Sequence, residues 1–143
     1  MKVAGSCSLP VPLERAYALL QNPDVLARCI PGCEGLDRVA EDEYAMRLKI
    51  GIAGISGRFD GKVRLSEQNP PLSFRMRVEA AGKIGFMIGD GVITLSVADS
   101  ASNIQFEGDV QVGGTIANLG QRLIEATAQM IIKRFFDCLA APP

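Results

Sequence analysis

Four cysteines are the residues of this 143-residue chain whose chemistry is most directly readable. Cys29 and Cys33 have a C-x3-C spacing that could form a redox pair, whereas Cys7 and Cys138 lie far from them. The chain has no histidine, so most zinc sites and the usual catalytic triads lack a partner. In a reducing compartment, cysteines are most simply small buried apolar residues. We therefore expect structural thiols, no metal and no cofactor, with the Cys29–Cys33 pair as the open alternative.

A catalytic acid or base would have to lie inside the fold with a pKa tuned toward neutral pH. Most carboxylates fall in turns or at outward strand positions, which leaves Asp90, between Gly89 and Gly91, as the best candidate, with Tyr17 and Tyr44 as helpers. The competing interpretation, which we favour, is a bulge or tight bend with a solvated carboxylate. We therefore expect no catalytic residue.

Phenylalanine and methionine residues at inward strand positions and along the last helix form an apolar set that could hold a ligand. Methionine adapts its shape and suits a loosely specific apolar pocket. The alternative is that these residues simply fill the core. The predicted cavity lining comprises Met46, Phe59, Phe74, Met76, Phe86, Phe106, Leu119, Leu123 and Met130.

Basic residues occupy outward positions on three consecutive predicted strands, with only Asp60 and Glu79 among them. If these strands are neighbours, the residues form a basic face that could dock on an acidic partner or on anionic lipid headgroups. The alternative is an ordinary solvated sheet face. The candidate docking face comprises Arg47, Lys49, Arg58, Lys62, Arg64, Arg75 and Arg77.

Composition and charge limit the class of protein. A hydrophobic share of 48% with 22% charged residues is that of a globular chain, and 143 residues predict one domain, 1–143, with an ordinary core. A net charge of −1 argues against nucleic acid as a partner. The start of the chain does not resemble a signal peptide, and the longest apolar stretch, 86–98, is interrupted by Asp90 and glycines. We expect a cytoplasmic protein, for which a homodimer is compatible with the sequence.

Hydrophobic periodicity predicts the elements that position these residues. Apolar residues with helical spacing predict a helix over 13–21, a second short helix capped by Asn22 and stopped at Pro31-Gly32, and a long helix over 115–139. Alternation with period two predicts strands over 2–9, 36–40, 44–52, 55–66, 72–79, 85–97 and 102–112. Short turns between consecutive strands make the predicted sheet antiparallel, with the long helix over its apolar face.

Glycine is unusually dense in this predicted sheet, although it weakens a strand by removing side-chain packing. Sharp coiling of the sheet and room for a ligand both explain the density, and composition does not decide between them. The glycines are Gly51, Gly54, Gly57, Gly61, Gly82, Gly85, Gly89, Gly91 and Gly108.

Strand, two short helices, six strands and a long helix is the helix-grip order, and four motifs accompany it. These are Ile30-Pro31-Gly32-Cys33-Glu34, Gly54-Ile55-Ser56-Gly57-Arg58-Phe59, Val112-Gly113-Gly114-Thr115-Ile116-Ala117 and Leu119-Gly120-Gln121-Arg122-Leu123. Together they resemble the G-subunit family of carbon monoxide dehydrogenase, part of the START-like (polyketide cyclase/lipid-transfer, SRPBCC) superfamily, over residues 3–136. One departure is Ala53-Gly54-Ile55, where the family often has Gly-Pro-Ile.

The resemblance implies an α+β helix-grip fold. A seven-stranded curved antiparallel sheet would wrap around the C-terminal helix, with two short helices between strands 1 and 2 and an internal apolar cavity. It further implies a non-catalytic accessory protein of a molybdenum-containing carbon monoxide dehydrogenase-type hydroxylase. Such a protein would hold a quinone or lipid-like molecule, or help recruit or mature the enzyme at the inner face of the membrane. The alternative within the superfamily is a cyclase or hydrolase acting on an apolar substrate.

Overall fold

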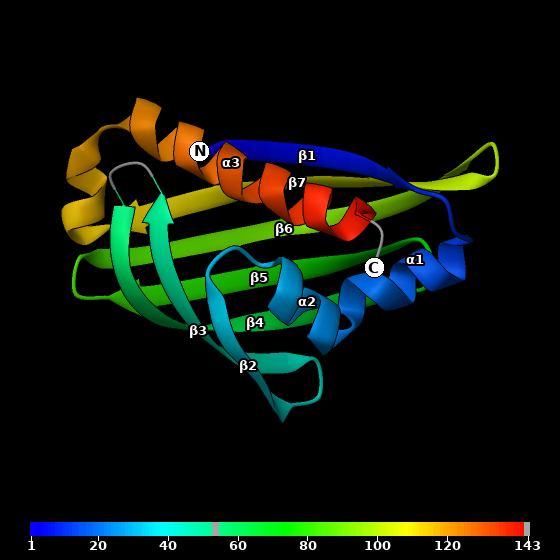
Figure 1. Ribbon diagram of the computed structural model, residues 1–143, viewed down its shortest axis with the longest axis horizontal. Helices are drawn as coiled ribbons and strands as arrows, with labels where there is room; N and C mark the ends of the chain where they lie inside the picture. The colour runs from blue at the N-terminus through cyan, green and yellow to red at the C-terminus, as the bar shows by residue number, and fades with distance from the viewer. Residues whose placement is uncertain (53–54, 142–143) are drawn as a thin grey trace.

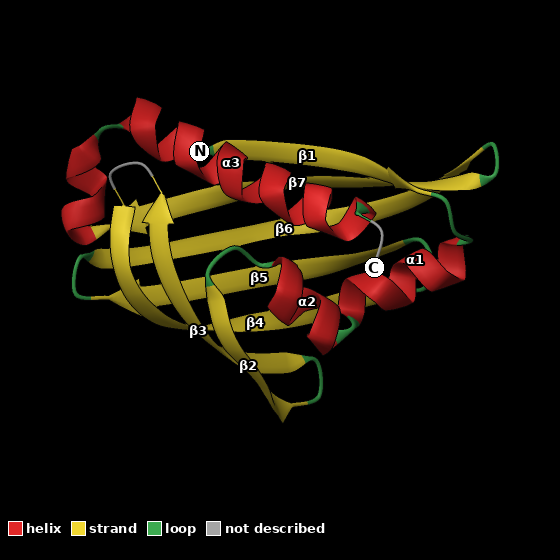
Figure 2. Ribbon diagram, viewed as in Figure 1, coloured by secondary structure: helices red, strands yellow, loops and turns green. Residues whose placement is uncertain are grey.

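One curved antiparallel sheet and the helices on its concave side make up the computed structural model, which describes residues 1–52 and 55–141 (Figures 1 and 2). In these ranges the sheet has seven strands in the order β1-β7-β6-β5-β4-β3-β2. The strands are β1 Lys2–Leu9, β2 Cys33–Ala40, β3 Glu43–Ile52, β4 Ile55–Asn69, β5 Ser73–Gly82, β6 Gly85–Ala98 and β7 Ala101–Gly113. The helices are α1 Leu13–Gln21, α2 Pro23–Cys29, the 3-10 helix η1 Gly114–Leu119 and α3 Gln121–Ala140. The predicted fold class is confirmed. Ala53 and Gly54 of the family-like motif lie outside the described residues.

Alternation along the strands sets the two faces of the sheet. On β3, Tyr44, Met46 and Leu48 are buried on the concave side, while Arg47 and Lys49 are exposed on the other. The predicted period of two is therefore confirmed where one face of the strand is covered and the other is wet.

Several strands are longer than their hydrophobic pattern predicts. β2 begins at Cys33, which pairs with Leu48, and β5 continues to Gly82, which pairs with Phe59 and Gly85. Backbone hydrogen bonds to a neighbouring strand extend a ladder into glycine or polar residues that carry no apolar alternation.

Asn22 separates the two short helices as expected. Its Oδ1 accepts hydrogen bonds from the backbone N–H groups of Asp24 at 2.9 Å and Val25 at 3.4 Å, and Pro23 occupies the first turn of α2. Gly32, with a φ of 78°, then turns the chain into β2, and its carbonyl accepts from the N–H of Lys49 at 2.8 Å. The Pro31-Gly32 stop is confirmed.

The prediction of one continuous helix over 115–139 is wrong. Residues 114–119 form η1, and Gly120, with a φ of 91°, separates it from α3. A φ in the left-handed region cannot continue a right-handed helix, so the helical phase restarts after Gly120. The buried side of α3 then carries Ile124, Thr127, Phe136 and Leu139.

Contact between α3 and β1 places this helix over the sheet. A Cβ atom on Gly5 of β1 would clash with Cγ2 of Ile132 and lie 2.9 Å from Cε2 of Phe136. Glycine at this position therefore lets the two α3 side chains rest directly on the strand backbone.

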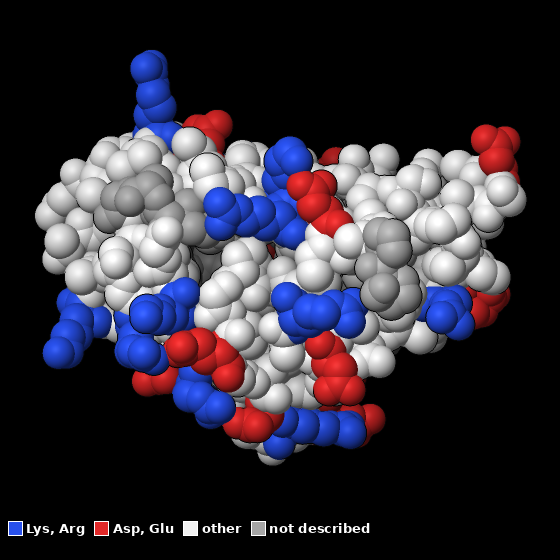
Figure 3. All heavy atoms as spheres, in the orientation of Figure 1, with Lys and Arg blue, Asp and Glu red and all other residues white. Residues whose placement is uncertain are grey.

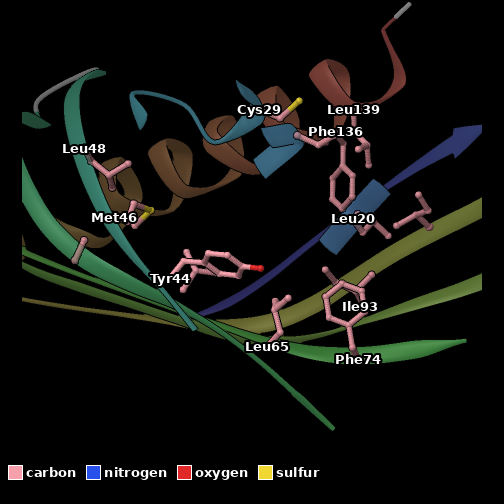
Figure 4. Close-up of a cluster of buried hydrophobic side chains, with 14 of the residues drawn as sticks. Leu20, Cys29, Tyr44, Met46, Leu48, Leu65, Phe74, Ile93, Phe136 and Leu139 are labelled. Atoms are coloured by element: carbon pink, nitrogen blue, oxygen red, sulfur yellow. The ribbon is translucent and has the colours of Figure 1, made fainter. Parts of the chain in front are cut away.

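A disulfide joins Cys29, the last residue of α2, to Cys138 near the end of α3, with 5.4 Å between their Cα atoms. The expectation of four free thiols is wrong, and so is the alternative Cys29–Cys33 pair, because the helix packing brings Cys138 to Cys29 across 109 residues. Cys7 and Cys33 are free. Figure 4 shows Cys29 beside Phe136 and Leu139 of α3, above the core side chains of the sheet.

Replacement of Cys138 by Ser tests the contribution of this cross-link. A bond across 109 residues restricts the unfolded chain, so we expect the free energy of unfolding to fall by about 2–4 kcal/mol. Urea denaturation without reductant measures this difference, and wild-type protein in dithiothreitol should match the variant. Cys33→Ser, which removes a free thiol, serves as the control with little change. Superimposable curves for all of these samples would contradict the cross-link.

Candidate ligand-binding cavity

A cavity of about 220 Å³ lies between α3 and the concave face of the sheet. α3 packs against β1, α2 and η1, so it crosses above the sheet and leaves space over the central strands. The strands contribute Val3, Met46, Leu48, Ile50, Ile55, Met76, Val78, Ala80, Met87, Gly89, Ile93, Phe106, Val110 and Val112. The helix α3 and the segment before β2 contribute Ile124, Thr127, Ala128, Ile131, Ile132, Phe135, Phe136, Ile30 and Pro31.

The wall of this cavity is apolar. Among the described residues that line it, only Thr127 carries a polar side chain, and its Oγ1 donates a hydrogen bond to the carbonyl of Leu123 at 2.8 Å. The threonine proton is thus used within the helix. The described wall can bury hydrocarbon but offers no free hydrogen-bond donor to a polar group.

The helical part of the wall follows from the sequence of α3. Ile124, Thr127, Ala128, Ile131 and Phe135 recur at intervals of three and four, so they lie along one side of the helix. This stripe was available in the sequence once the phase was counted from Gly120.

Glycines shape the floor of the cavity in two ways. Gly91 of β6 pairs with Gly108 of β7. A Cβ on Gly91 would clash with the ring of Phe106, and a Cβ on Gly108 would lie 2.9 Å from Cζ of the same ring. The Phe106 ring therefore lies over bare backbone. At Gly89 the nearest atom to an added Cβ is Cγ2 of Val110, 4.0 Å away. Close packing and open space thus both occur, at different glycines of the same sheet.

Three of the nine predicted lining residues, Met46, Met76 and Phe106, line the cavity. Phe59 and Phe74 are buried, but they belong to the packed core rather than to the cavity wall.

The remaining predicted lining residues lie elsewhere because of phase errors. Phe86 is 43% exposed, since the inward phase of β6 is that of Met87 and Ile93. Met130 is 38% exposed on the outer side of α3, because Gly120 resets the helix. Two further residues are half-buried outside the wall, namely Leu119 and Leu123.

Asp90, the candidate acid, does not reach the cavity. It continues β6 in regular pairing with Arg77 and Asp109, so the expected bulge is wrong. Its carboxylate lies on the convex face and forms ion pairs with Arg75 at 3.0 Å and Arg77 at 3.3 Å.

The two tyrosine candidates also lie outside the cavity wall. The Tyr17 hydroxyl donates to the carbonyl of Ser73 at 3.2 Å and contacts the Gln68 side chain, while its ring packs edge-on against Phe74. Tyr44 is buried in the core.

The convex face carries the seven basic residues predicted for docking, on the adjacent strands β3, β4 and β5. Among the described residues, six of the seven have an acidic partner and Lys49 has none, and most of these partners lie outside the residues counted in the sequence analysis. Arg58 pairs with Glu34 of β2 at 2.6 Å, and Arg47 with Asp37 of β2 at 3.2 Å. Further pairs join Lys62 and Arg64 to Glu43, Arg75 to Glu67, and Arg77 to Glu79. The face is mixed in charge, and docking through it stays a prediction.

The two free thiols are poor nucleophiles. Burial, and secondarily the charge of Asp137, raises the pKa of Cys7 from 9.0 to about 11. Burial also raises the pKa of Cys33, although a backbone hydrogen bond at Gly35 and the positive charge of Arg47 oppose this. In residues 1–52 and 55–141, no group of three His, Cys, Asp or Glu residues is arranged to hold a metal ion.

Fold and cavity together define a START-like protein of the helix-grip class, and comparison with known proteins gives the family. The model of the carbon monoxide dehydrogenase G-subunit (CoxG) family matches residues 5–142. This chain therefore belongs to the CoxG family. A crystal structure of a conserved protein from Geobacillus kaustophilus is 31% identical with a TM-score of 0.92, covering 98% of this chain and 93% of that one.

More distant structures share the fold alone. The Zhui aromatase/cyclase from Streptomyces sp. R1128 has 13% identity and a TM-score of 0.66, covering 98% of this chain and 91% of its own. A Chromobacterium violaceum protein has 18% identity and a TM-score of 0.67, covering 97% and 94%. No curated protein matches the chain. The family and the fold support a ligand-binding accessory or cyclase-like role. None of the helices in the described ranges is both long and apolar enough to cross a membrane.

Alkylation of Cys7 in the Cys33→Ser variant tests its buried environment. The thiolate is the reactive form, so a pKa of about 11 predicts slow reaction with iodoacetamide at neutral pH and a rate that keeps rising up to about pH 11. Mass spectrometry of samples quenched over time gives the rate. The same variant unfolded in urea, with the disulfide intact, should level off near pH 9. A folded-state rate that also levels off near pH 9 would contradict the buried position of this thiol.

Proposed function

We propose that this protein is a non-catalytic accessory protein that holds an apolar, quinone or lipid-like molecule for a molybdenum-containing carbon monoxide dehydrogenase-type hydroxylase. The apolar cavity under α3 is the observation that carries the proposal. Membership of the CoxG family supports the choice of enzyme partner. The recruitment or maturation of that enzyme at the inner face of the membrane is part of the same proposal.

The energetic cost of the cavity favours a ligand. An apolar space left empty lowers stability, because the side chains that line it lack contacting atoms on one side. A bound apolar molecule would restore the missing contacts. A purely structural core would be expected to close such a space.

The volume limits the part of a ligand that fits inside. A cavity of roughly 150 Å³ holds benzene, so 220 Å³ holds about nine carbon atoms, and a longer molecule must extend through an opening. At about 0.8 kcal/mol for each buried CH₂, nine carbons supply roughly 7 kcal/mol before the costs of association. We therefore expect a micromolar or weaker dissociation constant for a ligand of this size.

The composition of the wall favours binding over catalysis. No titratable side chain is found among the described residues that line the cavity, and Asp90 is on the opposite face of the sheet. Acid–base chemistry on an enclosed substrate needs such a group within hydrogen-bond reach. The likeness to an aromatase/cyclase, at 13% identity, concerns the fold and supplies no catalytic residue here.

Gly89→Leu tests the cavity as the binding site. The backbone at this position accepts a side chain without strain, and the leucine would enter the cavity, where its nearest neighbour is Val110. We expect binding of N-phenyl-1-naphthylamine, a neutral fluorescent apolar probe, to weaken at least ~10-fold, because leucine replaces several carbons of ligand. Filling a void should leave the melting temperature equal or higher.

Gly51→Leu is the matched control. Gly51 is also a strand glycine, and no atom of the described residues lies within 4 Å of an added Cβ, but it is exposed rather than cavity-lining. This variant should bind the probe as the wild type does. Equal binding by both variants, with normal melting curves, would show that the probe does not enter the cavity.

The enzyme partner is tested by direct association. Size-exclusion chromatography of the purified protein with a purified carbon monoxide dehydrogenase-type molybdenum hydroxylase from the same cells should show co-elution. A molybdenum hydroxylase of another substrate class serves as the control. Separate elution at micromolar concentrations of both proteins, with apolar ligand present, would count against this partner while leaving the cavity proposal intact.

A further inference from the structure

We propose that the ligand is an amphiphile with one anionic group, a carboxylate or a phosphate, and that Arg28 and Arg134 bind this group at the opening of the cavity. The inference rests on the proposed function and specifies the chemical class of ligand for the same site. It follows from the apolar wall, the partly exposed segment after α2, the positions of the two arginines and their lack of acidic partners among the described residues.

The apolar wall keeps a polar group out of the cavity. The only polar side chain in the described wall, Thr127, already donates to Leu123, so an enclosed carbonyl, hydroxyl or charge would lose its hydrogen bonds to water without replacement. Such a loss costs several kcal/mol for a neutral group and more for a charge. A ligand with a polar end must therefore leave that end at the surface.

The wall includes a partly exposed segment on the α2 side. Ile30 and Pro31, directly after α2, are half-buried cavity residues, and Ile131 faces the same space from α3. The Cys29–Cys138 disulfide joins α2 to α3 next to this segment. Figure 3 shows the surface hollowed on the face that carries α2 and α3, with Lys and Arg side chains beside the hollow.

Two arginines lie on the helices that border this segment. Arg28 is in the last turn of α2, two residues before Ile30. Arg134 precedes Cys138 by four residues and follows Ile131 by three, so it lies on the side of α3 between the disulfide and the cavity. Both side chains are exposed.

Neither arginine has an acidic partner in residues 1–52 and 55–141. Asp137, the acidic residue nearest to Arg134 in the sequence, is bonded to Lys133 at 2.7 Å. The arginines of β3, β4 and β5, by contrast, each have a carboxylate partner. Two unpaired guanidinium groups beside an apolar space match an anion on a hydrocarbon chain, because guanidinium binds carboxylate and phosphate oxygens in the same fork-like geometry.

Binding of matched ligands with one carbon chain tests the inference. Decanoate and decyl phosphate carry the anion and decanol does not, while a chain of about nine to ten carbons suits a volume of 220 Å³. Isothermal titration calorimetry should show tighter binding of both anions than of decanol. The double variant Arg28→Gln/Arg134→Gln should lose about 10-fold in affinity for the anions, with no change for decanol. Tighter binding of decyl phosphate than of decanoate would indicate that the anionic group of the ligand is a phosphate.

Controls separate this inference from the proposed function. Arg122→Gln removes an exposed arginine at the start of α3, outside the cavity wall, and should change nothing. Gly89→Leu should weaken all three ligands, and equal binding by this variant would overturn the cavity as their site. Equal affinities for decanol and the anions, unaffected by the arginine changes, would overturn the anionic ligand and leave the apolar cavity standing. If none of the three binds to folded wild-type protein, the proposed function fails as well.

Discussion

The close contact between α3 and β1 is the constraint on which the rest of the structure depends. Because Gly5 has no side chain, Ile132 and Phe136 rest on the strand backbone, and the helix is held at one edge of the sheet rather than over its centre. The disulfide from Cys138 to Cys29 holds the end of the same helix against α2. These two contacts hold α3 across the concave side of the sheet and keep it from packing directly on the central strands. The cavity is the space between the helix and those strands.

The sheet supports this arrangement through the different uses of its glycines. A Cβ on Gly61 would clash with the carbonyl oxygen of Glu79, so there glycine allows two strands to approach closely. Gly91 and Gly108 give the ring of Phe106 a place on the backbone, whereas Gly89 leaves open space beside it. Curvature and cavity are therefore not competing explanations. The same sheet needs close approach at some positions so that its concave side can remain open at others.

The two faces of the sheet are stabilised by different interactions. The concave side is apolar, and its stabilisation comes from burial, reduced by the space left empty. The convex side carries alternating acids and bases whose exposed ion pairs each contribute little to stability but keep the face solvated and free of a single charge sign. Arg28 and Arg134, on the helices beside the cavity, have no such partner among the described residues. These two arginines therefore offer unpaired positive charge on the helices that line the cavity.

The sequence by itself determined the order of the elements, the antiparallel sheet, the Asn22 cap, the Pro31-Gly32 stop and the family. These depend on local periodicity and on turn or cap chemistry, both of which involve only residues close together in the sequence. Only the tertiary structure decided which inward-facing strand residues line the cavity and which, such as Phe59 and Phe74, pack in the core instead. It also decided the pairing of Cys29 with Cys138 and the neutralisation of the convex face by Glu34, Asp37 and Asp90. Those contacts join residues distant in the chain or on neighbouring strands, and no local pattern encodes the distance between them.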